Sequence, residues 1–212
     1  MSGSLPPPES SPLRPLPARP TRIILTGFMG AGKTTVGALL ARRLAWTFLD
    51  SDRIVEERAA STIAAIFERQ GEAAFRHLEA AAVRDACRLD QLVLALGGGA
   101  LELPSTRDFL AALSATLIVF LEAPLETMVA RCTAHADAPV RPVLADRPGL
   151  AERWNRRLPG YRQAHLTIET AELSPDAVVL RILETLDPLL RAEPGSNGRS
   201  LFDSSGKRGL LA

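Results

Sequence analysis

Positions 27–34 read GFMGAGKT, which completes the pattern G-x-x-x-x-G-K-[ST] of a phosphate-binding loop. Glycines let backbone N–H groups curl round an anion without Cβ clashes, and a compact ammonium group suits the β- and γ-phosphates of a nucleotide. That ammonium group is Lys33, one of only two lysines among the 25 Lys and Arg residues of the chain. The use of lysine at this position therefore indicates phosphate chemistry.

The segments on either side must form the elements that hold this loop. Residues 22–26 are a short, apolar, β-branched run, which predicts a buried strand, and residues 33–44 carry apolar side chains at helical spacing. A strand thus leads into a glycine turn that opens a helix, and the helix N-terminus adds a partial positive charge. We expect the phosphate contacts to come from Gly27, Gly30, Ala31, Gly32, Lys33, Thr34 and Thr35.

A pair of aspartates and a second group of glycines each follow a predicted strand. A short strand from 47 to 49 ends at Asp50 and Asp52, and a strand from 91 to 96 runs into the triple glycine at 97–99. We expect Asp50 and Asp52 to alternate at the strand end and to point to opposite sides. Asp52 as the N-cap of the next helix is the plainer alternative. Glycines at two strand ends predict two backbone-lined pockets at one sheet edge, and hence two substrates.

The remaining segments alternate between helical and strand-like patterns. Five strands separated by helices predict an α/β fold, in which a five-stranded parallel sheet lies between two helical layers and ligands bind at the carboxyl ends of the strands. Residues 133–148 mix Ala, Asp, Pro and Arg and are expected to be a mobile segment. Helices are expected near 63–87, 105–113, 124–131, 149–158 and 175–190, and further strands at 116–121 and 165–168.

Length and composition set the limits of the domain. Residues 1–21 are proline-rich and residues 192–212 are Gly/Ser-rich, so both are expected to be disordered tails around one domain at 22–191. A net charge of +1 without a basic stripe argues against a nucleic-acid partner. No apolar stretch approaches the about 18 residues that span a bilayer. We therefore expect a soluble, cytoplasmic protein, and a monomer. Cys87 and Cys132 share no short metal or redox spacing, and we expect both to be small buried hydrophobic residues.

Together these motifs resemble the shikimate kinase family, small P-loop kinases of the nucleoside monophosphate kinase type. The resemblance covers roughly residues 22–190. It implies the family's P-loop kinase fold, with a lid at about 133–148 and a substrate-binding helical region. The family transfers the γ-phosphoryl group of ATP to the 3-hydroxyl of shikimate, with Mg²⁺, on the chorismate route to aromatic amino acids. The matching blocks are the phosphate loop, FLDSD at 48–52, the IF, GE and FRHLE motifs between 66 and 79, GGGA at 97–100, RPVL at 141–144 and RLPGY at 157–161.

The resemblance implies a binding site for the acceptor, shikimate. Arg76 and Arg157 match the family's carboxylate-binding positions, and their planar guanidinium groups can form bidentate contacts. Glu79 lies three residues after Arg76 on a predicted helix, close enough to hold its guanidinium group. Gly98 and Gly99 would let the acceptor ring approach the backbone.

The resemblance also assigns the groups around the transferred phosphate. Asp50 would face Mg²⁺ through water beside Thr34, and Asp52 would receive the acceptor hydroxyl. Lys33, Asp52 and Arg141 are the expected catalytic residues, Arg141 acting from the lid over the phosphates. Arg131 is a candidate for the adenine contact, although ten positions separate it from Arg141.

Other readings of the phosphate loop stay open at this point. A GTPase would need an Asn-Lys-x-Asp motif, which the sequence does not contain. A kinase for gluconate or a nucleotide shares the loop, and domains of similar sequence also serve as non-catalytic ligand sensors. Three positions depart from the usual family pattern: Ala60 replaces a glycine, Val143 a leucine, and Gly160 the leucine of a Pro-Leu-Tyr motif.

Overall fold

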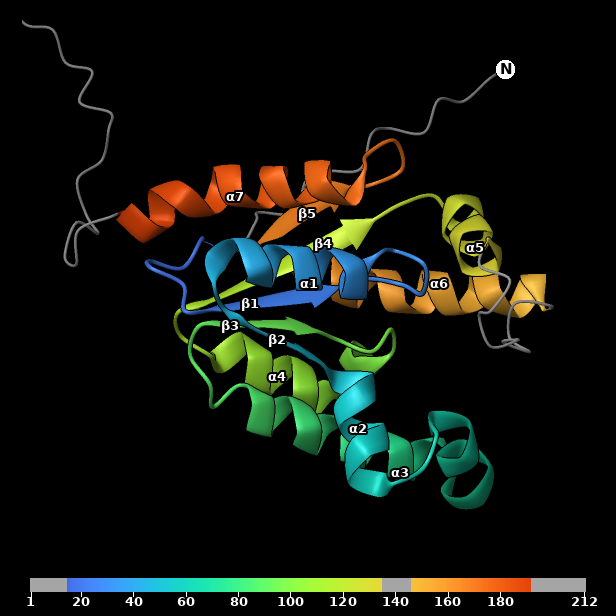
Figure 1. Cartoon of the computed structure of the whole chain (residues 1–212). Helices are drawn as coiled ribbons and strands as arrows, with labels where there is room; N and C mark the ends of the chain where they lie inside the picture. Colours follow the sequence, from blue (N-terminus) through green and yellow to red (C-terminus); the bar gives the residue numbers. More distant parts are fainter. Residues whose placement is uncertain (1–14, 135–145, 192–212) are drawn as a thin grey trace, which may run out of the picture.

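The computed structural model describes residues 15–134 and 146–191, and a parallel β-sheet forms its centre. Within these residues the sheet has five strands in the order β2-β3-β1-β4-β5, and every neighbouring pair is parallel (Figure 1). The predicted α/β fold with a five-stranded parallel sheet is confirmed. The strands are β1 (Arg22–Thr26), β2 (Thr47–Asp50), β3 (Leu92–Ala95), β4 (Thr116–Glu122) and β5 (Leu166–Glu169).

The strand order decides which face of the sheet each helix covers. Crossovers between parallel strands are right-handed, so a reversal of the direction of travel across the sheet changes the face. The chain moves outward from β1 to β2 through α1, and then travels the opposite way through α3, α4 and α6. Helix α1 therefore lies on one face, where α7 packs beside it (Figure 1), and the other three lie on the opposite face. Their bounds are α1 (Lys33–Leu44), α3 (Ile63–Ala86), α4 (Pro104–Ala112), α6 (Arg147–Tyr161) and α7 (Pro175–Arg191).

The central strands are apolar along their whole length because helices cover both faces. Ile23, Ile24 and Leu25 of β1 have no exposed surface, and β4 is buried as far as Leu121. The apolar run stops at the carboxyl edge of the sheet, where the phosphate loop follows β1 and the triple glycine follows β3. The core thus ends where polar backbone becomes accessible to a ligand.

Helices α2 (Ser51–Ala59) and the first half of α3 project away from the sheet (Figure 1). They share a small core of their own, in which Val55 of α2 packs with Ile66 and Phe75 of α3. Helix α3 is interrupted at Gly71, whose φ of 80° and ψ of 170° lie outside the helical region and suit glycine alone. This projection matches the helical region expected beside the sheet.

Helix α6 is longer than the sequence pattern suggested, and its start has a clear physical cause. The carboxylate of Asp146 accepts a hydrogen bond from the N–H of Gly149 at 3.1 Å and caps the helix. Pro148 lies in the first helical turn, where its missing N–H costs nothing. The helix therefore begins at Arg147 instead of Gly149, and it continues through Pro159 to Tyr161.

Most of the expected lid lies outside the described residues. Of the segment 133–148, Thr133 ends helix α5 (Leu125–Thr133) and Arg147 opens α6, while residues 135–145, including Arg141, are not described. The two predicted tails also lie largely outside the described part of the chain. Among the residues that the structure describes, no helix has the length and apolar character of a membrane span.

Two glycines inside helices give a test of the packing. A Cβ on Gly37 of α1 would lie 2.5 Å from a ring carbon of Phe48 and 3.2 Å from Leu25 Cδ1, whereas one on Gly160 of α6 would have its nearest neighbour at 3.6 Å. Gly37→Ala should lower the free energy of unfolding by about 1–3 kcal/mol through overpacking. Gly160→Ala should raise it by up to about 1 kcal/mol, because alanine is the better helix former. Chemical denaturation checks both; equal effects of the two changes would contradict the packing at Gly37.

Candidate active site

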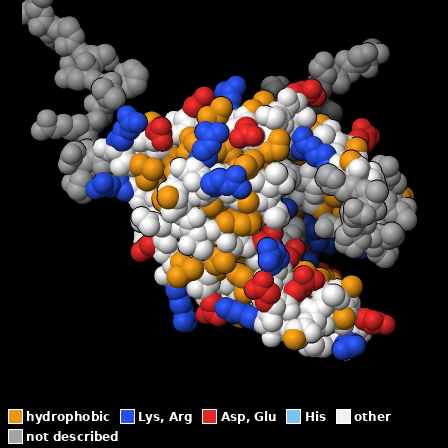
Figure 2. All heavy atoms as spheres, viewed as in Figure 1, with side chains coloured by type: hydrophobic (Ala, Val, Ile, Leu, Met, Phe, Trp, Pro, Cys, Tyr) orange, Lys and Arg blue, Asp and Glu red, His pale blue; other side chains and the backbone are white. Residues whose placement is uncertain are grey.

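A cavity of about 570 Å³ opens at the carboxyl edge of the sheet. The phosphate loop forms one wall, and Asp50, Asp52 and Gly98 lie beside it. Further lining residues come from the end of α5 and from the turn between β5 and α7. Figure 2 shows the surface hollowed between the α2–α3 projection and the body, with positive and negative side chains interspersed on this face. The cavity has the size of a nucleotide-like ligand.

The backbone of the phosphate loop adopts the conformation that its glycines predict. Gly30 and Gly32 have φ of 76° and 92°, and a Cβ on Gly30 would lie 2.1 Å from the backbone oxygen of Met128. The Nζ of Lys33 donates to the carbonyl oxygens of Gly27 and Phe28 at 2.8 and 2.9 Å. The ammonium group is therefore held across the loop, beside the N-terminus of α1. An anion bound there would be stabilised both by the charge of Lys33 and by the partial positive charge of the helix N-terminus.

Asp50 and Asp52 take different positions from those expected. Strand β2 ends at Asp50, and Asp52 lies in the first turn of α2, so they do not alternate on one strand. The expectation was wrong in its geometry, because residues two apart on a strand share a face. The N-cap is Asp50, whose Oδ1 accepts from the N–H of Asp52 at 3.0 Å, so the alternative of Asp52 as the cap is also wrong.

The other oxygen of Asp50 meets the phosphate loop. Thr34 Oγ1 lies 2.8 Å from Asp50 Oδ2, so one hydroxyl and one carboxylate stand together at the mouth of the loop. Mg²⁺ prefers oxygen ligands and keeps several waters, binding through one or two protein groups plus substrate phosphates. This pair fits that requirement. Within the described residues no group of three or more His, Cys, Asp or Glu side chains offers a metal site of its own.

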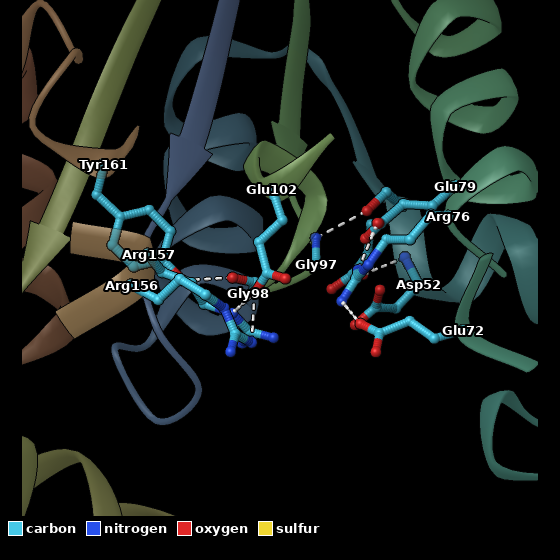
Figure 3. A network of polar contacts seen from close by, with 12 residues as sticks. Asp52, Glu72, Arg76, Glu79, Gly97, Gly98, Glu102, Arg156, Arg157 and Tyr161 are labelled. Carbon is cyan, nitrogen blue, oxygen red and sulfur yellow. Dashed lines mark hydrogen bonds and ion pairs between the residues drawn. The ribbon is translucent and has the colours of Figure 1, made fainter. Parts of the chain in front are cut away.

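A second group of charged residues surrounds the triple glycine (Figure 3). Arg76 of α3 pairs with Glu79 at 2.7 Å and with Glu72 at 3.0 Å, which confirms the expected contact between Arg76 and Glu79. A Cβ on Gly99 would lie 2.1 Å from Arg76 Nη2, and one on Gly97 would lie 2.2 Å from Glu79 Oε1. A Cβ at either position would therefore force a charged side chain to shift, and neither glycine has a left-handed φ.

Glu79 is an unusual carboxylate because it is only 2% exposed. Burial raises the pKa of Glu79 to about 7, although the positive charge of Arg76 opposes this shift, and the negative charge of Asp52 adds to it. Its Oε1 has no hydrogen-bond partner within the described residues and faces the space beside Gly97 that Asp52 Oδ1 also borders. The two carboxylates thus lie close together beside the triple glycine, in the part of the site expected to bind the acceptor (the acceptor side).

Arg157 reaches the triple glycine from the opposite side (Figure 3). Its Nε donates to Glu102, and its guanidinium carbon lies 5.6 Å from the centre of the Phe28 ring. A Cβ on Gly98 would lie 3.6 Å from Arg157 Nη1. The hydroxyl of Tyr161 donates to the carbonyl of Gly98, and burial raises the pKa of Tyr161, so this hydroxyl remains a donor at neutral pH. Arg76 and Arg157 therefore flank the same glycines.

An aromatic cluster supports Arg157 and joins the two halves of the site. The ring of Trp154 makes an edge contact with Phe28 of the phosphate loop, at 5.6 Å between centroids. Tyr161 stacks on Phe120 of β4 at 5.2 Å and contacts Trp154 at 6.1 Å. Neither this cluster nor Glu102 is among the residues predicted from the sequence, although the RLPGY motif contains Tyr161 and Glu102 lies two residues after the end of the GGGA motif.

The structure also places Arg131, the two cysteines and His165. Arg131 donates to Thr170 and to the carbonyl of Ala171, and it lines the cavity. Cys87 is buried as predicted, and burial raises its pKa to about 11. The same prediction for Cys132 is wrong, because this side chain is partly exposed and lines the cavity. His165 has a structural role, since its Nδ1 accepts from the N–H of Ile118 at 3.0 Å.

Comparisons with known proteins agree with this geometry. The family model described as shikimate kinase matches residues 29–187. The chain is 40% identical over 186 residues to a shikimate kinase of Salinibacter ruber, which covers 82% of this chain and 88% of that protein. It is 41% identical over 167 residues to one of Geobacter sulfurreducens, covering 79% and 91% of the two chains.

Solved structures give the same result. A shikimate kinase of Acinetobacter baumannii in complex with shikimate has a TM-score of 0.73 and 36% identity, covering 80% of this chain and 94% of that one. A gluconokinase of Sinorhizobium meliloti has a TM-score of 0.54 over 82% of this chain and 95% of that one, but only 17% identity. The second likeness shows the fold alone.

The buried carboxylate of Glu79 predicts a dependence of stability on pH. The unfolded chain releases this proton near 4.5, whereas the folded protein retains it to about 7, so ionisation destabilises the fold. The stability of the wild type relative to Glu79→Gln should therefore fall between pH 4.5 and 7 by about 3 kcal/mol, and level off above. Urea unfolding of both proteins at each pH measures this difference. Parallel curves would mean that Glu79 is not protonated in the fold.

Proposed function

The chain belongs to the shikimate kinase family, and from this premise we propose that it transfers the γ-phosphoryl group of ATP to the 3-hydroxyl of shikimate. The observation that carries the proposal is the meeting of two half-sites at Asp52. On one side of Asp52 lies the phosphate loop with Lys33, and on the other lie Arg76 and Arg157 around the triple glycine. A phosphate donor and a small carboxylate-bearing acceptor can therefore be held against each other.

The acceptor side fits a small hydroxylated acid. Arg76 and Arg157 offer guanidinium groups on either side of Gly98, suited to one carboxylate. Gly98 lets the ring lie against the backbone, and the acceptor hydroxyl would then point toward Asp52. In this arrangement the carboxylate of Asp52 accepts the hydroxyl proton while the new O–P bond forms and the bond to ADP breaks.

The donor side supplies positive charge to the transferred group. Lys33 and the N–H groups of the loop hold the phosphates, and we propose that Arg141 joins them from the lid and helps to exclude water. Bound Mg²⁺ would neutralise charge on the phosphates, and Thr34 with Asp50 is the pair that would hold it. That the domain is confined to 22–191, and that it acts as a cytoplasmic monomer, stay predictions.

Two alternatives are less well supported. The likeness to a gluconokinase is limited to the fold, at 17% identity, whereas the identity to the shikimate kinases of Geobacter sulfurreducens and Acinetobacter baumannii is 41% and 36%. A non-catalytic sensor would have no need of Lys33, Thr34 and Asp52, all of which line the cavity here.

A panel of acceptors tests the proposed reaction. ADP release should be far faster with shikimate than with gluconate, nucleoside monophosphates or no acceptor, in the presence of ATP and Mg²⁺. Equal rates with gluconate, or shikimate binding without turnover, would refute the proposal.

The two aspartates should respond differently to mutation. Asp52→Asn keeps the size of the side chain but loses the basic oxygen, so phosphoryl transfer should fall by about 10²–10⁴ with little change in the binding of Mg-ATP. Asp50→Asn should raise the Mg²⁺ concentration needed for half-maximal rate, and excess metal should partly restore activity. Titration of Mg²⁺ for each variant provides the measurement. Rescue of the Asp52 variant alone would mean that the two roles are interchanged.

A further inference from the structure

Glu102 is a charged neighbour of the acceptor side that the family motifs do not include. It lies at the end of the 3-10 helix η1 (Ala100–Glu102), directly after the triple glycine. Its Oε1 accepts from Arg157 Nε and lies 3.6 Å from Arg156 Nη2. The side chain of Glu102 is 23% exposed and that of Arg157 only 10% exposed, so the contact is largely shielded from solvent. Shielding makes such a charge-assisted contact stronger than a surface ion pair.

The backbone under Glu102 is fixed from two directions. The N–H of Glu102 donates to the carbonyl of Gly99 at 2.9 Å, which closes η1 onto the triple glycine. Arg107 of α4 donates to the carbonyls of Leu101 and Glu102 at 2.7 and 3.1 Å. The carboxylate is therefore presented from a turn that is itself held in place, as it must be if it is to fix the guanidinium group of Arg157.

The contact leaves most of the Arg157 guanidinium available. Glu102 uses Nε, while the Phe28 ring lies near the guanidinium carbon and Nη1 points toward Gly98. A guanidinium has five N–H donors in a planar fork, so an arginine held at Nε can still offer its two terminal nitrogens to a carboxylate. Glu102 and an acceptor carboxylate thus need not compete for the same edge.

The charge of Glu102 also favours a lasting contact with Arg157. Burial pushes the pKa of the Glu102 carboxyl up, but the hydrogen bond and positive charge of Arg157, with Arg156, outweigh it and lower the pKa overall. Glu102 is therefore ionised at neutral pH.

A cavity of about 250 Å³ lies on this side of Arg157, bordered by Gly160, where the family's leucine would place a side chain. With this cavity beside it, Arg157 has room to move unless Glu102 holds it.

We infer that Glu102 is a positioning residue, which fixes the guanidinium of Arg157 so that its terminal nitrogens face the acceptor's carboxylate beside Gly98. The inference rests on the proposed function, since it concerns the acceptor of that same site. It makes Glu102 a determinant of acceptor affinity and not of the phosphoryl-transfer step.

Kinetics of Glu102→Ala and Glu102→Gln test this role. Glu102→Ala should raise the KM for shikimate by about tenfold, which corresponds to about 1.4 kcal/mol, while kcat changes less than about threefold and the KM for ATP stays the same. Glu102→Gln keeps an acceptor oxygen of the right size and should restore part of the lost affinity.

A matched control comes from the far end of the sheet. Asp90 pairs with Arg22 at 2.7 Å, and the Arg22 side chain is 13% exposed, so this pair resembles that of Glu102 and Arg157 in burial of the arginine. Asp90→Asn removes the same charge away from the site and should leave the KM for shikimate unchanged. Thermal melting of all the variants shows whether each is folded at the assay temperature.

A second substrate makes the test specific to the carboxylate. With the methyl ester of shikimate, which lacks the charge that Arg157 would bind, the wild type and Glu102→Ala should have equal kcat/KM. A lower KM for shikimate in Glu102→Ala would show that Glu102 competes with the acceptor. A fall in kcat together with a rise in the KM for shikimate and in the KM for ATP would show a structural role only. Either result overturns the inference. The proposed function is tested separately in the same assay, by the phosphorylation of shikimate by the wild type.

Discussion

Residues 97–99 have no side chains, and charged groups from other elements fill the space where Cβ atoms on Gly97 and Gly99 would lie. Arg76 and Glu79 of α3 occupy the space beside Gly99 and Gly97, and Arg157 of α6 approaches Gly98 from the other side. None of the three glycines has a positive φ, so their role is to leave volume free and not to relieve backbone strain. The positions of Arg76, Glu79 and Asp52 depend on this volume, because a Cβ on Gly97 or Gly99 would force one of these side chains to shift.

The two arginines around these glycines are held in different environments. Arg76 is paired with a carboxylate that is almost fully buried, and burial dominates, so the pKa of Glu79 is raised. Arg157 is paired with a carboxylate that retains some exposure, and there burial is outweighed by the hydrogen bond from Arg157 and the nearby positive charges together, so the pKa of Glu102 is lowered. The site thus combines one partner that can be neutral near pH 7 with one that stays ionised. Each pair would have to remain oriented while a ligand carboxylate joins it, which requires supports outside the pair itself.

The parts of the site that could be predicted from sequence are those set by local pattern. The loop around Lys33, the five strands and the spacing of Arg76 and Glu79 follow from residue type and periodicity over a few positions. The pairing of Glu102 with Arg157 joins residues 55 positions apart, and only the packing of α6 against η1 brings them together. The error over Asp50 and Asp52 is of another kind, since both were placed at the strand end, whereas Asp50 caps α2 and Asp52 already lies in the first turn of that helix.

The contact between Trp154 and the phosphate loop gives the protein an intrinsic optical probe. Trp154 touches Phe28, which is part of the donor side, and Tyr161, whose hydroxyl holds Gly98 on the acceptor side. The second tryptophan, Trp46, lies between α1 and β2 near the opposite end of the strands. Fluorescence from Trp154 therefore senses changes in both half-sites, whereas that from Trp46 supplies a constant background. Occupancy of the site can be followed by emission, without a label and without turnover.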